Sequence, residues 1–142
     1  MNRTVAIFRA SLVAFVLLEI AVIVKVLLIG HGHLPEPARA YLRWWHETPQ
    51  SAVERAVAWI GLLTVAIAIA SALAMTAFAR WARPVFAVCI ALICASELLI
   101  DYPVLKSPIE YFLEAVLGVV AGAIIVFSYW SRAADGFAKN AP

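Results

Sequence analysis

The sequence predicts an all-α integral membrane protein, with four transmembrane helices in an antiparallel bundle and a short interfacial helix between the first two. Long apolar segments, few charges within them and an unusually apolar composition predict this class. Of the 142 residues, 65% are hydrophobic and 14% are charged, and the mean hydropathy is +0.93. Soluble domains are roughly 45–50% apolar and about 25% charged. The net charge of +2, without a basic stripe, is not that of a nucleic-acid-binding protein.

The chain is expected to form one domain, residues 1–142, with spans over residues 5–29, 53–78, 85–100 and 109–129. A hydrocarbon core about 30 Å thick needs about 20 helical residues at about 1.5 Å each. The N-terminus has the basic start of a signal peptide, but its apolar run exceeds the roughly 7–15 residues of such peptides. That run also contains Glu19 and Lys25. We therefore interpret it as a retained first transmembrane helix.

The distribution of Lys and Arg favours a topology with both termini in the cytoplasm. The inner ends then carry Arg3, Arg9, Arg80, Arg83, Arg132 and Lys139, and the outer side carries Arg39, Arg43, Arg55 and Lys106. Cytoplasmic loops carry an excess of basic residues, and short loops such as residues 80–84 carry most of this signal. Because the sequence shows no transit peptide or endomembrane signal, we expect a bacterial cytoplasmic (inner) membrane.

The outer loop, residues 31–52, contains a predicted short helix over residues 38–47. Tyr41, Trp44 and Trp45 gather toward one side of this helix. Aromatic rings with a polar group prefer the headgroup region of a bilayer. We therefore expect an interfacial helix on the outer leaflet, and the alternatives are a lid over a site between the helices and a docking surface for a partner.

Small residues predict close helix packing. Gly118 and Gly122 form a GxxxG motif in the fourth span, and alanines alternate along the second span between residues 66 and 74. Small residues let helix backbones approach closely in a membrane. We expect this packing within the four-helix unit, with an interface between copies of the chain as the alternative.

Acidic residues near the outer ends of the third and fourth spans are candidates for an ion or proton site. Glu97 and Asp101 are four residues apart and share a helix face, and so do Glu110 and Glu114. A hairpin between the two spans would bring these carboxylates to a similar depth. Glu110 is explained by a capping box that begins at Ser107. The other three need a partner, a proton or water.

Glu19 differs from these acids because it lies near the middle of a span. Lys25, a candidate cation for the outer acids, lies about 120° away from it around the helix. We expect the Glu19 carboxyl group to be protonated or hydrogen-bonded across helices, with Thr64, Ser71 and Ser96 as candidate partners. Ionisable residues within a membrane are candidates for transport, and the structural alternative is a polar fastener between helices.

The sequence contains few residues in patterns typical of enzymes, metal sites or cofactor sites. His31 and His33 form a lone H-x-H pair, and no histidine lies inside a span to hold a haem. Cys89 and Cys94 do not form a C-x-x-C motif and are expected to be small buried hydrophobes. The sequence contains no nucleophile elbow, phosphate loop or HExxH motif. We therefore expect no catalytic residue, no cofactor and no metal.

Residues 100–129, with their Lys106-Ser107-Pro108 turn, resemble the final hairpin of the phosphate-starvation-inducible E family of four-helix membrane proteins. The resemblance covers 30 of the 142 residues. That family carries a basic residue in its third helix, whereas the third span here carries Glu97. The resemblance is thus local and does not place the chain in the family.

The sequence predicts a small multi-pass membrane protein that acts as a non-enzymatic accessory, assembly or interaction subunit of a membrane complex. The alternative is a small oligomeric carrier or channel whose outer carboxylates attract a cation or relay protons. The expected partners are the lipid bilayer and a protein partner or second copy, bound through helix faces and the outer aromatic helix. No nucleic acid is expected.

Reporter fusions test the predicted orientation. A reporter fused after Pro142 should be active in the cytoplasm, and one inserted near Pro37 should be active in the periplasm, because the basic residues favour cytoplasmic termini. A C-terminal fusion active only in the periplasm would contradict this topology and indicate an odd number of spans.

Overall fold

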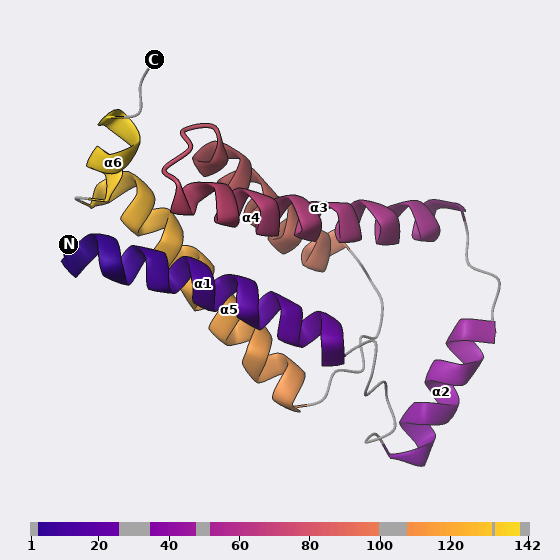
Figure 1. Ribbon diagram of the computed structural model, residues 1–142. Helices are drawn as coiled ribbons and strands as arrows, with labels where there is room; N and C mark the ends of the chain where they lie inside the picture. Colours follow the sequence, from indigo (N-terminus) through magenta and orange to yellow (C-terminus); the bar gives the residue numbers. More distant parts are fainter. Residues whose placement is uncertain (1–2, 26–34, 48–51, 100–107, 132, 140–142) are drawn as a thin grey trace.

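The computed structural model describes residues 3–25, 35–47, 52–99, 108–131 and 133–139, and every regular element among them is a helix (Figure 1). The helices are α1 (Arg3–Val24), α2 (Glu36–Glu47), α3 (Ala52–Thr76), α4 (Ala82–Leu99), α5 (Pro108–Trp130) and α6 (Ala134–Lys139). Three stretches are long and apolar enough to cross a membrane: Arg3–Val24, Arg55–Thr76 and Tyr111–Trp130. The apolar part of α4, Ala82–Ser96, is shorter. These three candidate spans therefore support the prediction of an all-α membrane protein.

The helix bounds agree with the predicted segments to within a few residues. The predicted second and fourth spans are α3 and α5, and α4 begins slightly before its predicted start. Pro84 lies in the first turn of α4, where its missing N–H costs no helical hydrogen bond. The expected outer end of the first span, beyond residue 25, lies outside the described residues.

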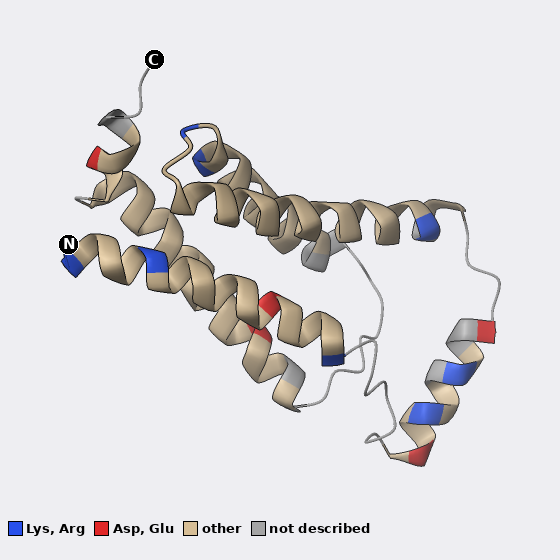
Figure 2. Cartoon of the chain, viewed as in Figure 1, with Lys and Arg blue, Asp and Glu red and all other residues tan. Residues whose placement is uncertain are grey.

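The four long helices pack in two neighbouring pairs. Helix α3 packs against α4, and α1 packs against α5, as Figure 1 shows. Contacts of α1 with α3 and of α4 with α5 join the pairs. Among the described residues, α2 packs against no other helix. Figure 2 shows that charged residues gather near helix ends and on α2, except for acidic residues that lie side by side on α1 and α5.

The buried core is small and rich in phenylalanine and alanine. Phe15 of α1 packs edge to face against Phe86 of α4, with ring centroids 5.1 Å apart. Ala68 and Ala72 of α3 are fully buried, whereas the alternating Ala66 and Ala70 are exposed, so only some of these alanines face a neighbouring helix. Many large apolar side chains point outward instead. Such a surface fits contact with lipid, because hydrocarbon solvates apolar side chains.

The C-terminal helix α6, which the sequence analysis did not predict, closes one end of the long helices through aromatic contacts. The Phe137 ring of α6 lies 6.0 Å from that of Phe8 in α1 and 5.1 Å from that of Phe78. The guanidinium of Arg9 lies over the Phe78 ring, 5.3 Å from its centroid. This cluster joins the start of α1, the α3–α4 turn and the C-terminal helix.

Arg80, in the α3–α4 connection, and Arg83, in the first turn of α4, strengthen the same end. Arg80 donates from Nε to the carbonyl oxygen of Phe137 at 2.7 Å. Arg83 donates to the carbonyl oxygen of Ser128 at 2.9 Å, and its guanidinium lies 4.6 Å from the Phe137 ring centroid. Hydrogen bonds from charged donors are stronger than neutral ones. Arg80 therefore joins α6 to the α3–α4 connection, and Arg83 joins α5 to the first turn of α4.

The Phe78 ring packs closely against Gly136 at this end of the helices. Phe78 has a φ of 57°, in the left-handed region that a bulky residue rarely adopts, and its ring is held between Phe8 and Phe137. A Cβ atom at Gly136 would lie 2.6 Å from two carbons of that ring. Only glycine therefore fits at residue 136 without moving the cluster.

Gly136→Ala should destabilise the folded chain by about 1–3 kcal/mol, because the added methyl group overpacks a ring that has no room to move. The measurement is the free energy of unfolding from an SDS titration in mixed micelles. Gly61→Ala is the control, because a Cβ there meets nothing within 4 Å. Equal stability of the two variants would contradict this close contact.

Candidate functional site

A cavity of about 310 Å³ lies between the four long helices, and each of them contributes to its lining. Its walls are mainly apolar and include Phe15 and Val22 of α1, Val65 of α3, Ile93 of α4 and Leu117 of α5. This volume is at the lower end of the roughly 300–1,000 Å³ of small-molecule pockets.

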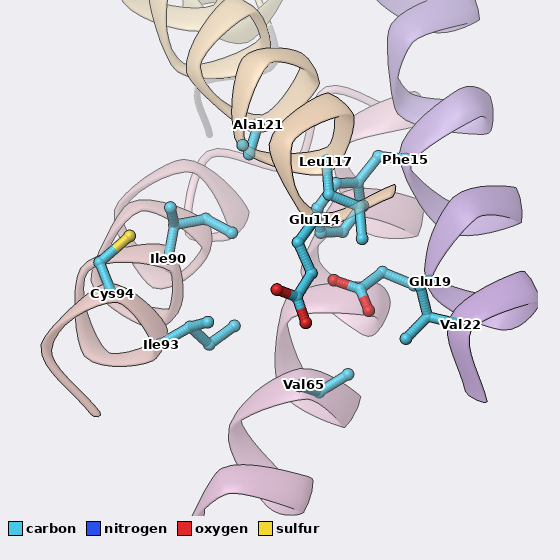
Figure 3. A pocket seen from close by; sticks show the side chains of 11 residues that line it. Phe15, Glu19, Val22, Val65, Ile90, Ile93, Cys94, Glu114, Leu117 and Ala121 are labelled. Atoms are coloured by element: carbon cyan, nitrogen blue, oxygen red, sulfur yellow. The ribbon is translucent and has the colours of Figure 1, made fainter. Parts of the chain in front are cut away.

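Two carboxyl groups enter this cavity from different helices. Glu19 of α1 and Glu114 of α5 both line it, and Figure 3 shows their carboxyl groups pointing toward one another. Glu19 is half-buried and Glu114 is exposed, so the cavity is open where Glu114 lies. The structure thus brings together two predicted site residues that lie far apart in the sequence.

The helical period explains why both side chains point inward. On α1 the buried residues Phe8, Leu12 and Phe15 form one stripe, and Glu19 follows at the next position of that stripe. On α5 Glu114 precedes Leu117, Ala121 and Ile124 in the same way, and the last two are buried. Each glutamate therefore extends the inward face of its helix.

The two carboxylates would repel each other if both were ionised. The apolar walls around the half-buried Glu19 lower the effective dielectric constant on its side and so strengthen this repulsion relative to water. A positive charge between the groups, either a proton or a cation, relieves it. The arrangement can therefore hold a proton or a cation.

The expected hydrogen-bond partners of Glu19 are engaged elsewhere. Thr64 donates to the carbonyl oxygen of Ile60 at 2.7 Å, Ser71 to that of Ala68 at 2.9 Å and Ser96 to that of Ile93 at 2.7 Å. Helical Ser and Thr hydroxyls readily bond one turn back along their own helix. These bonds use the hydroxyl hydrogens and leave the oxygen lone pairs able to accept, but no hydrogen bond joins Glu19 to these hydroxyls among the described residues.

The rest of the predicted acidic cluster is described only in part. Asp101 lies outside the described residues, and Glu97 and Glu110 lie on α4 and α5 with side chains that are also outside them. Lys25 directly follows α1, and both Lys25 and Glu114 take part in interactions. Glu114 is therefore the one acid of this predicted cluster whose side chain is described, and the structure places it beside Glu19 rather than beside another member of the cluster.

Among the described parts of the chain, the GxxxG motif does not bring two helices together. Gly118 and Gly122 are exposed, and a Cβ atom at either would meet nothing within 4 Å. The face of α5 that contains Ala121 and Ile124 is buried instead. The predicted packing within the unit is thus wrong for these two glycines, and Gly118 lines the cavity.

The residues considered for metal and redox chemistry are only partly described. Among the described residues, no group of three or more His, Cys, Asp and Glu could hold a metal ion. His31 and His33 lie outside them. Cys89 is buried as expected, whereas Cys94 is exposed and lines the cavity.

The predicted helix of the outer loop is α2, and three of its charged residues form salt bridges. Glu36 forms salt bridges of 2.6 Å with Arg39 and with Arg43. The rings of Tyr41 and Trp44 lie 5.7 Å apart, and Trp44 is exposed. The side chain of Trp45 is outside the described residues. Helix α2 thus combines an aromatic pair, of which Trp44 is exposed, with a cluster of salt-bridged charges.

No protein-family model, curated protein or solved structure matches this chain. Function therefore has to follow from the cavity and its two carboxyl groups. Ionisable side chains at membrane depth are expensive and commonly mark paths of ions, protons or substrates.

Proposed function

We propose that this chain is a small cation carrier of a bacterial cytoplasmic membrane, in which Glu19 and Glu114 bind a cation or relay a proton. The observation that carries this proposal is the pair of carboxyl groups facing each other in a cavity between long apolar helices. A purely structural role would favour apolar residues here, because each glutamate interrupts an inward-facing apolar stripe.

The proposal includes four membrane spans, α1, α3, α4 and α5, in an antiparallel bundle with both termini in the cytoplasm. Helix α4 has 18 residues, which at about 1.5 Å per residue gives about 27 Å, close to the hydrocarbon thickness. Helix α2 lies on the outer leaflet in this arrangement. Its exposed Trp44 and the lack of packing against other described helices support that place.

Transport requires the carboxyl pair to be reached from both sides of the membrane. Four helices enclose little space, so the carrier works as an oligomer or with a partner. The exposed face of α5 at Gly122 has no side chain that would keep a neighbouring helix away, so a second helix can approach closely there. This face supports the oligomeric form of the proposal.

An accessory subunit of a membrane complex is the second candidate function. The observations that favour it are the exposed glycines of α5 and helix α2, which packs against no other described helix. In this case the exposed helix faces bind a larger protein, and the carboxyl pair contributes to assembly. The two candidates differ in whether the purified chain moves cations by itself.

A flux assay in proteoliposomes distinguishes the two functions. The purified chain should carry Na⁺, K⁺ or protons down an imposed gradient. Glu19→Gln and Glu114→Gln should each lower the flux about tenfold or more, because each removes a charged hydrogen-bond acceptor from the site. Glu47→Gln, on α2, is the control and should leave the flux unchanged.

Two results would contradict the carrier. One is the absence of any flux from the parent chain, and the other is a flux that survives both cavity substitutions. Absence of flux together with a stoichiometric partner that co-purifies in mild detergent would favour the accessory subunit.

A further inference from the structure

The cavity offers a ligand few polar atoms besides the carboxyl groups. Among its lining residues, Glu19 and Glu114 supply all the side-chain oxygen atoms, and Cys94 adds a thiol. The lining contains no serine, threonine or amide side chain. Helical backbone carbonyls are hydrogen-bonded within their helices. A ligand that fits must therefore satisfy two carboxyl groups and place the rest of its surface against hydrocarbon.

A dehydrated divalent metal ion fits these walls poorly. Two carboxylates supply at most four oxygen atoms, whereas Ca²⁺ takes about 6–8 oxygen ligands and Mg²⁺ prefers an octahedral set. A metal ion that kept its water shell would have to place that water against Phe15, Ile93 and Leu117. Such contacts between bound water and apolar side chains leave hydrogen bonds unmade.

An organic ammonium ion matches both the two carboxyl groups and the apolar walls of the cavity. It has several N–H donors that carboxylate oxygens accept in strong, charge-assisted hydrogen bonds. A hydrocarbon body next to the nitrogen would bury its surface against the apolar walls, at about 25 cal/mol per Å². The volume of about 310 Å³ suits a small amine.

We propose that the cavity binds small protonated amines with an apolar body, held between the carboxyl groups of Glu19 and Glu114. This inference rests on the proposed cation site and names the chemical class of its ligand. Access is from the open side, where Glu114 is exposed. Phe15, which is fixed by its edge-to-face contact with Phe86, forms part of the wall for the apolar body.

Calorimetric titration of the purified chain in lipid nanodiscs tests the charge requirement. The probe is phenethylamine, and 2-phenylethanol serves as the uncharged analogue of nearly the same shape. The amine should bind at least about tenfold more weakly to Glu19→Gln and Glu114→Gln, because each loses a charge-assisted hydrogen bond. Binding to Glu47→Gln should match the parent, and the alcohol should bind weakly to all variants.

A steric variant tests whether the apolar body lies in the cavity. Gly118→Leu fills part of the cavity and leaves both carboxyl groups in place, and a Cβ atom there has open space. Amine binding should fall about tenfold, because overlap with the added side chain removes apolar contact. Gly61→Leu is the matched control, since Gly61 also has open space and lines a separate cleft between α3 and α4.

The outcomes separate this inference from the proposed function. Flux of inorganic cations or protons that needs Glu19, together with no amine binding, overturns the inference and leaves the carrier in place. Amine binding that depends on both glutamates, without any flux, supports the ligand class and overturns the carrier. Amine binding that is unchanged in Glu19→Gln and in Gly118→Leu overturns the proposed ligand site.

Discussion

Polar groups on the long helices have to be satisfied within the protein, because hydrocarbon offers them no hydrogen bonds. The hydroxyl groups of Thr64, Ser71 and Ser96 meet this requirement by donating to carbonyl oxygens of their own helices. An ionised carboxylate has no hydrogen to donate in this way. Glu19 and Glu114 point into a shared cavity instead. The candidate site follows from this difference between hydroxyl and carboxyl groups.

Helix α1 packs into the aromatic cluster near α6 and also forms part of the cavity wall. Phe8 lies in the aromatic cluster with Phe78 and Phe137, and Phe15 contacts Phe86 farther along the helix. Phe15 is also part of the cavity wall, one turn before Glu19. Rigid packing of the preceding turns thus fixes the direction in which the Glu19 side chain points. A carboxyl group needs such support to hold its place in a binding site.

The sequence was sufficient for the helical class and for locating Glu19 within a long apolar helix, because long apolar runs and a charge within one of them are strong signals. The pairing of Glu19 with Glu114 could not be predicted, since it depends on how α1 and α5 are rotated against each other. Helix α6 was missed because six residues give a weak helical signal and its position depends on contacts of Phe137. The role of Gly118 was misjudged because a small residue fits both a helix contact and an open surface.

A double-mutant cycle tests most directly whether Glu19 and Glu114 form one site. The measurement is the free energy of unfolding of the parent, Glu19→Gln, Glu114→Gln and the double variant in mixed micelles. The two changes should depart from additivity by about 0.5–3 kcal/mol, because each alters the same interaction across the cavity. Glu19→Gln combined with Glu47→Gln should be additive. Additivity of the Glu19 and Glu114 changes to within about 0.3 kcal/mol would contradict a shared site.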